Sequence, residues 1–113
     1  MNGPEDRIVI HAELVGNYFS NLINLFYKIL PMRENGEETL PVYLESLAFE
    51  LAGARSLIEA IRYDAQFLSL LAILQNLIDH PDTDVAVVKR EVFRAISVCN
   101  KLKARHGFRK LEQ

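Results

Sequence analysis

Apolar residues recur along this chain at alternating intervals of three and four positions, the spacing of one face of an α-helix. The pattern predicts four amphipathic helices, over about residues 4–30, 41–62, 65–80 and 84–106. In the first helix the residues expected to face inward are Ile8, Ala12, Val15, Phe19, Leu22, Phe26 and Ile29. In the second helix they are Leu44, Leu47, Leu51, Ala54, Ile58 and Ile61. In the last helix they are Val85, Val88, Val92, Ile96, Cys99 and Leu102.

The predicted ends of the helices rest on capping and breaking residues. Pro31 is expected to stop the first helix, and Pro81 the third. Thr39 is a plausible N-cap for the second helix, ahead of a proline in its first turn. Gly107 suits the position just past the end of the fourth helix, so we expect residues 107–113 to form a loose tail.

The boundary between the second and third helices is the least marked. Neither glycine nor proline interrupts the apolar spacing there, although Asp64 can cap a new helix. We expect a break near residues 63–66. The alternative is one kinked helix from Pro41 to His80, roughly 60 Å long at about 1.5 Å per residue, which a lone domain of this size covers poorly and which nearly requires a dimer.

The third helix is apolar on almost every side. Between Ala65 and Ile78 only Gln66, Ser69, Gln75 and Asn76 are polar. Such a helix has to be covered by its own chain or by another. We therefore expect it to form the central wall of a single domain over residues 1–113, an all-α antiparallel four-helix bundle of the up-down type with short connections. The surplus apolar surface also favours a homodimer or a constant protein partner.

The second helix carries a ridge of small side chains beside its inward face. Small residues allow the backbone of another helix to come close. The ridge consists of Ala48, Ala52, Ser56 and Ala60, with Gly53 and Ala54 beside it.

Charge is distributed unevenly along the chain, although the net charge is only −2. Residues 1–84 hold 5 Lys and Arg against 13 Asp and Glu, whereas residues 85–113 hold 8 against 2. Four of the later cations, Arg90, Arg94, Lys101 and Arg105, share one outward stripe of the last helix. The stripe is interpreted as a solvated face, with an acidic protein or a nucleic-acid backbone as possible partners.

The first helix has an outward face without charge. It carries Asn17, Asn21 and Asn24, positions where exposed helices usually hold Lys or Glu. Because amides are cheaper to desolvate than charges, this asparagine face is a second candidate for a partner or subunit contact.

Few residues suggest chemistry. One cysteine, Cys99, lies on an inward face, where a thiol is inert. The histidines His11, His80 and His106 do not show metal-ligand spacing, and we expect no metal or other cofactor. Neither a secretory leader pattern nor an apolar run near the roughly 20 residues of a membrane span is present, so a cytoplasmic location is expected, without membrane partners.

The sequence thus favours a non-enzymatic protein-interaction or regulatory module, and the expected partner is a second copy of the chain or another protein. A nucleic-acid-associated protein that uses the basic stripe is the alternative, and an enzyme or metalloprotein ranks third.

Overall fold

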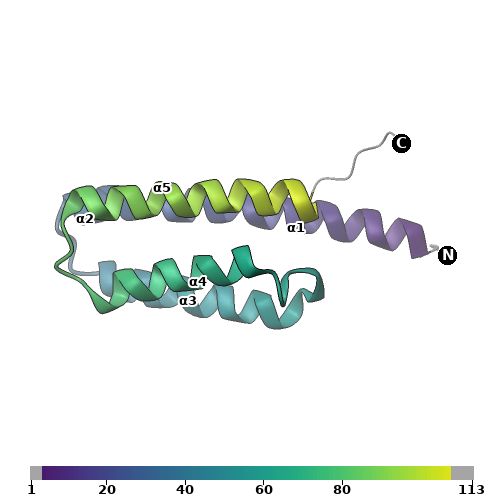
Figure 1. The fold of residues 1–113 in the computed structure, drawn as a ribbon, viewed down its shortest axis with the longest axis horizontal. Helices are drawn as coiled ribbons and strands as arrows, with labels where there is room; N and C mark the ends of the chain where they lie inside the picture. Colours follow the sequence, from purple (N-terminus) through teal and green to yellow (C-terminus); the bar gives the residue numbers. More distant parts are fainter. Residues whose placement is uncertain (1–3, 108–113) are drawn as a thin grey trace.

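A computed structural model describes the backbone of residues 4–107 and the side chains of residues 13–107. Within these residues the chain folds as an antiparallel four-helix bundle, as the sequence predicts. The helices alternate in direction along an elongated body of 52 × 25 × 22 Å. Figure 1 shows two layers, one made of the first and last long helices and the other of the two middle helices.

The first helix, α1, spans Pro4–Tyr27, and a short helix, α2, follows at Ile29–Glu34. The prediction that Pro31 ends the first helix is wrong, because Pro31 lies in the first turn of α2. A proline ring clashes with the carbonyl four residues earlier, which here belongs to Tyr27, the last residue of α1. The helix is interrupted at Lys28 alone, whose φ of −64° and ψ of −20° stay in the helical region, and the chain remains helical for another turn and a half.

The loop after α2 begins with a tightly capped helix end. Gly36 has a positive φ of 64°, which only glycine adopts readily, and the amide of Glu37 reaches back to the carbonyl of Met32 at 3.0 Å. The amide of Gly36 donates to the backbone carbonyl of Arg33 at 3.2 Å, and the two bonds together form a Schellman motif. These bonds fix the direction in which the chain leaves α2.

The next helix, α3, spans Leu40–Leu57 and ends five residues before the predicted Arg62. Ile58 is extended, with φ −104° and ψ 102°, and a 3-10 turn, η1, follows at Glu59–Ile61. The early end lets the chain reverse while Ile61 is still buried. The predicted break before the third helix is confirmed, and the single kinked helix is wrong. Thr39 precedes α3, but its hydroxyl makes no capping bond.

The third long helix, α4, spans Ala65–Asp79, close to its predicted limits. The Asp64 side chain caps it by accepting from the Gln66 amide at 2.8 Å. The last long helix, α5, spans Val85–Leu102 and continues as a π-helix, η2, at Lys103–Gly107.

Gly107 does not end the last helix in the predicted way. It is the final residue of η2 and lies directly against Gly16 of α1: a Cβ placed on Gly107 would be 2.4 Å from the Gly16 Cα. Two glycines thus let α1 and η2 touch backbone to backbone. The rest of the predicted tail, residues 108–113, lies outside the described residues.

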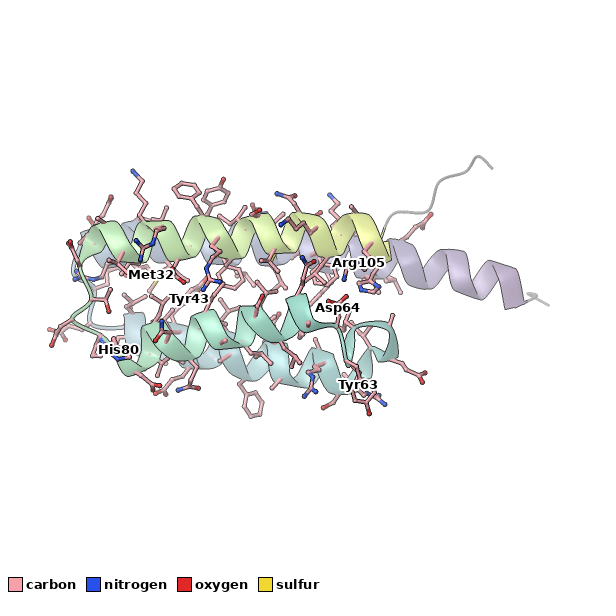
Figure 2. All side chains as sticks on the ribbon, in the orientation of Figure 1. Met32, Tyr43, Tyr63, Asp64, His80 and Arg105 are labelled. Atoms are coloured by element: carbon pink, nitrogen blue, oxygen red, sulfur yellow. The ribbon has the colours of Figure 1, made fainter. Side chains whose placement is uncertain are left out.

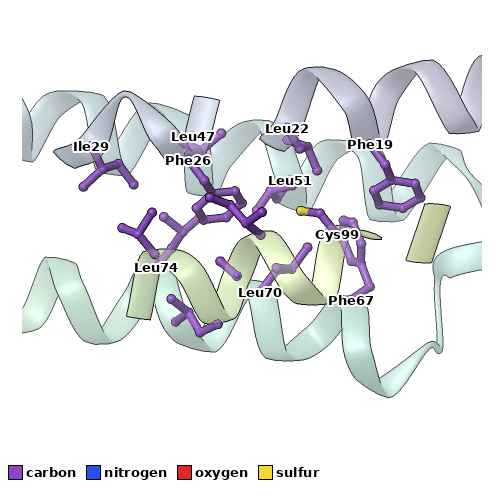
Figure 3. Packing of buried hydrophobic residues seen from close by; sticks show 14 of the residues in the cluster. Phe19, Leu22, Phe26, Ile29, Leu47, Leu51, Phe67, Leu70, Leu74 and Cys99 are labelled. Carbon is purple, nitrogen blue, oxygen red and sulfur yellow. The ribbon is translucent and has the colours of Figure 1, made fainter. Parts of the chain in front are cut away.

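The core fills the space between the two layers (Figure 3). Every described inward residue of the predicted faces is buried or partly buried except Val85, which is 37% exposed. The largest fully buried side chains of the core are three phenylalanines, of which Phe19 and Phe67 meet edge to face at 6.2 Å between ring centroids. The Phe26 ring lies further along the same seam of α1.

The apolar circumference of α4 is largely covered by the chain itself, since only Leu68 among its large apolar side chains is exposed, at 39%. Surplus apolar surface therefore lies elsewhere. Within the described residues, the structure contains no helix that is long and apolar enough to cross a membrane.

Candidate interaction surface

The most exposed of the large apolar side chains that the structure describes lie on the outer side of α3 and, at Tyr63, shortly after its end. Phe49 and Leu57 are 82% and 84% exposed, and Val42 is 66% exposed, although all three belong to a well-formed helix. Exposed phenylalanine and leucine are unfavourable in water, at about 25 cal/mol for each Å² of apolar area. We call Val42, Phe49, Gly53 and Leu57, with the small residues between them, the α3 face.

Small residues separate these apolar side chains. Ser46, Ala52 and Ser56 are exposed, and a Cβ placed on Gly53 would meet nothing within 4 Å. The small-residue ridge recognised in the sequence therefore points mainly away from the bundle, with only Ala48 half-buried. No described helix of the chain lies over this ridge, so the close approach that it allows is available to a helix from another molecule.

The α3 face is symmetric about Gly53. Phe49 and Leu57 lie four residues before and after it, about 40° to either side of it around the helix. If a second α3 runs antiparallel across Gly53, the Phe49 ring of each copy meets the Leu57 side chain of the other. The face is thus self-complementary in position as well as in chemistry, as a two-fold interface requires.

Charge along α3 has opposite signs at its two ends. Glu45 and Glu50 are exposed in its first half. At its far end the Arg55 Nε donates to the Arg62 carbonyl at 2.7 Å, and the Arg62 guanidinium donates to the Ser56 carbonyl at 2.8 Å. Neither arginine lies within 4.0 Å of a described carboxylate. Arg55 is two residues after Gly53, so it projects about 160° away from Gly53 around the helix and lies on the side of α3 opposite to the α3 face.

The predicted asparagine face lies in the other layer. Asn17, Asn21 and Asn24 are all exposed on α1, as expected. Near the α2 end of the same layer, Tyr27 of α1 and Phe93 of α5 pack edge to face at 6.0 Å and remain partly exposed. The structure does not bring the asparagine face and the α3 face together, because they belong to opposite layers (Figure 1).

The basic stripe faces outward, but most of its charge is already paired. Arg90 and Arg94 both approach Glu91, at 3.7 and 2.7 Å. Arg105 binds Asp64 at 2.7 Å. Among the four cations of the stripe, Lys101 alone lacks a carboxylate within 4.0 Å in the described part of the chain.

Asp64 joins the start of α4 to η2 at one end of the bundle (Figure 2). Its side chain, 6% exposed, accepts from the Arg105 guanidinium at 2.7 Å and lies 2.6 Å from the His106 Nε2. Burial opposes ionisation, but the hydrogen bonds from His106, the Gln66 amide and Arg105 outweigh it and lower the pKa of Asp64. The cluster holds two chain segments together, and sequence spacing alone did not reveal it.

The buried titratable groups are unsuited to nucleophilic chemistry. Burial raises the pKa of the Cys99 thiol to about 12, so the reactive thiolate is scarce at neutral pH. Burial, and then the charge of Glu50, raise the pKa of the Tyr18 and Tyr43 hydroxyls. The Tyr43 hydroxyl donates to the Leu25 carbonyl at 2.7 Å, whereas the Tyr18 hydroxyl has no described partner.

The two histidines whose side chains are described, His80 and His106, lie at different places in the bundle. His80 follows α4, with its Nδ1 3.0 Å from the Asn76 carbonyl, and His106 contacts Asp64. The His11 side chain lies outside the described residues. Within residues 13–107, no three His, Cys, Asp or Glu side chains gather as a metal site would need.

The fold therefore places the chain in the class of antiparallel four-helix bundles. Comparison with protein-family models, with curated proteins and with solved structures finds no match for the chain.

Sequence reasoning identified the small-residue ridge but not the apolar side chains around it. Val42, Phe49 and Leu57 lie outside the inward seam of their helix, at intervals of seven and eight residues. Apolar residues left over from a seam are the signal that marks a second, outward face.

Proposed function

We propose that this chain is a non-enzymatic interaction module that forms a homodimer through the α3 face. The observation that carries the proposal is the exposure of Phe49 and Leu57, at 82% and 84%, on either side of Gly53. In water this arrangement is unfavourable for a monomer. In an antiparallel pair each phenylalanine is covered by the leucine of the other copy, and the open space at Gly53 lets the two backbones approach.

The non-enzymatic part of the proposal rests on how the reactive side chains are used. Cys99 has a raised pKa, and Asp64 and His106 are engaged in holding α4 to η2. The single buried cysteine also supports a cytoplasmic location, which we include in the proposal.

The alternative role, association with nucleic acid through the basic stripe, has weaker support. Three of its four cations already lie within 4.0 Å of a carboxylate, whose negative charge lowers the attraction of the stripe for a phosphate backbone. Binding of duplex DNA or RNA that weakens steeply with salt, and that is lost on replacing Arg90, Arg94 and Lys101 with Glu, would favour it over the dimer.

The mass of the protein in solution tests the proposal. Light scattering should give twice the chain mass of 12.9 kDa for the wild type and the single chain mass for Phe49→Asp. Phe93→Asp is the matched control, because Phe93 is a partly exposed phenylalanine in the other layer, and it should remain dimeric. A monomeric wild type, or a Phe49→Asp protein that stays dimeric, would contradict the proposal.

A further inference from the structure

A cavity of about 420 Å³ opens at the end of the bundle opposite to Asp64, the end marked by Met32 and His80 in Figure 2. The helices α2 to α5 contribute to it, together with the loop after α2 and the turn between α4 and α5. Its volume lies within the range of small-molecule sites in proteins, about 300–1,000 Å³. The residues of the α3 face do not border it, so the cavity and the proposed dimer contact are separate surfaces.

The cavity is lined mostly by apolar side chains. Leu44, Leu77 and Val88 are buried core residues of three different helices, and all three border it. An apolar group placed here would leave water and contact the same side chains that form the core. The partly buried apolar residues of the lining are Met32, Leu40 and Ile78.

The charged side chains that border the cavity are mainly acidic. Glu37 and Glu38 lie in the loop after α2, and Asp82 lies in the turn after α4. All three are exposed, and none lies within 4.0 Å of a cationic side chain among the described residues. Against them stands the single guanidinium of Arg33, so the border of the cavity carries net negative charge. Such a border attracts a cation and repels an anion.

The Arg33 side chain is engaged with the protein itself. Its Nη2 donates to the Thr83 carbonyl at 2.9 Å, which ties α2 to the turn after α4. Its Nε is shielded from solvent, so a ligand in the cavity does not reach that atom. Arg33 therefore supports the wall of the cavity, and its charge offsets only one of the three carboxylates.

The helix ends around the cavity do not reverse this negative charge. α2 and α4 end here, whereas α3 and α5 begin here. A helix carries roughly half a negative charge at its C-terminus and half a positive charge at its N-terminus, so two ends of each kind largely cancel. The carboxylates therefore determine which charge is favoured in a ligand.

We propose that this cavity binds a small amphipathic monocation, a compact apolar body that carries one ammonium group. The apolar body packs against Leu44, Leu77 and Val88, and the ammonium group lies at the acidic border of the cavity. Apolar burial supplies most of the affinity, because exposed carboxylates attract a cation only weakly. The carboxylates supply the selectivity for a cation over a neutral or anionic molecule of the same shape.

Three probes with the same seven-carbon framework separate these two contributions. Cyclohexylmethylamine is a cation at pH 7, cyclohexylmethanol is neutral, and cyclohexanecarboxylate is an anion. Titration of the full chain at low salt, followed by two-dimensional amide NMR, gives the dissociation constants and the location of the contacts. The amine should shift amides around Met32, Leu44 and Leu77. It should bind about fivefold more tightly than the alcohol, and the carboxylate should bind most weakly.

Salt and a triple variant test the origin of this selectivity. Raising the ionic strength to about 1 M should remove most of the preference for the amine, because exposed charges are then screened within about 3 Å. Replacing Glu37, Glu38 and Asp82 by their amides should remove the preference at low salt and leave the affinity for the alcohol unchanged. A matched control removes three exposed carboxylates that do not border the cavity, and it should keep the preference. The control variant carries Glu13→Gln, Glu50→Gln and Glu59→Gln.

A space-filling variant tests the location of the apolar part. Met32 is partly buried and borders the cavity, so Met32→Trp should occupy much of its volume. Binding of both the amine and the alcohol should be lost while the circular dichroism of the helices is retained. Binding of either probe with wild-type affinity in this variant would contradict the assignment to the cavity.

Three further results would overturn the proposal. These are an amine that binds no more tightly than the alcohol to the wild type, a triple variant that keeps the preference, and amide shifts confined to residues outside the cavity, such as Phe49 and Leu57. None of them depends on whether the chain is a dimer, so the cavity and the α3 face are tested independently.

Discussion

Replacement of Asp64 by asparagine should lower the free energy of unfolding by about 1–2 kcal/mol at neutral pH. An asparagine oxygen still accepts from the Gln66 amide, and asparagine is as good an N-cap as aspartate. The loss thus comes from removing the negative charge of the Asp64 carboxylate, whose Oδ2 lies 2.7 Å from the Arg105 Nη1 and 2.6 Å from the His106 Nε2. The Arg105 pair contributes about 0.2–1 kcal/mol because that side chain is 50% exposed, and the less exposed His106 contact supplies the rest.

The pH dependence of this loss follows from the lowered pKa of Asp64. The unfolded chain binds the proton first, near the ordinary value of 3.8, so the stabilisation is complete above about pH 4 and disappears as pH falls through the lower, folded-state pKa. Asparagine cannot titrate. The difference between wild type and Asp64→Asn should therefore narrow below about pH 4.

Urea denaturation followed by circular dichroism, at one protein concentration and at pH 7 and pH 2.5, measures both effects. In thermal unfolding the loss corresponds to roughly 4 °C for each kcal/mol. Asp82→Asn, in the exposed turn after α4, is the matched control and should change little. The reasoning would be refuted by a loss below about 0.5 kcal/mol at pH 7, or by a loss that is the same at both pH values.

Three further variants and one chemical modification test the packing. Leu74→Ala should lower the free energy of unfolding by about 2–5 kcal/mol in urea titrations, and Leu71→Ala by clearly less, because Leu74 is fully buried and Leu71 only partly. Equal losses would mean that α4 presents a different face to the core. Gly107→Ala should destabilise by at least about 1 kcal/mol, since its new Cβ would be 2.4 Å from the Cα of Gly16, and a neutral effect in the same titration would rule out that backbone contact. Cys99 should react with a thiol reagent such as dithionitrobenzoate only after denaturant is added, and rapid reaction of the native protein would contradict its burial.

The periodic part of the fold was predictable from the sequence, and the chain reversals were less so. The seams from Val15 to Ile29 and from Val88 to Leu102 are buried as their spacing requires, and Asp64 caps α4. Helix ends depend on tertiary contacts that spacing does not contain. Ile58 leaves the helical conformation so that Ile61 can be buried.

The candidate site was only partly predictable for the same reason. The small-residue ridge was visible in the sequence, but its outward direction depends on how α3 rotates against α4. The all-round apolarity of α4 pointed to association, yet α4 is mostly covered, and the exposed apolar surface lies around Phe49 and Leu57. The cavity beside Arg33 needs four helices, α2 to α5, and the turn between α4 and α5 to meet, which no single segment encodes.

The pairing of α3 across Gly53 is tested most directly by a disulfide at that position. Gly53→Cys places one thiol per copy at the centre of the proposed antiparallel pair, and native Cys99 is buried and does not interfere. Ser46→Cys is the control, because in this register the two introduced thiols are about 20 Å apart along the helices, well beyond the reach of a disulfide.

Mild oxidation followed by non-reducing electrophoresis should give a covalent dimer for Gly53→Cys and only a single chain for Ser46→Cys. Cross-linking of both variants would mean a parallel pair, and failure of Gly53→Cys to cross-link would mean that α3 does not pair with itself at all.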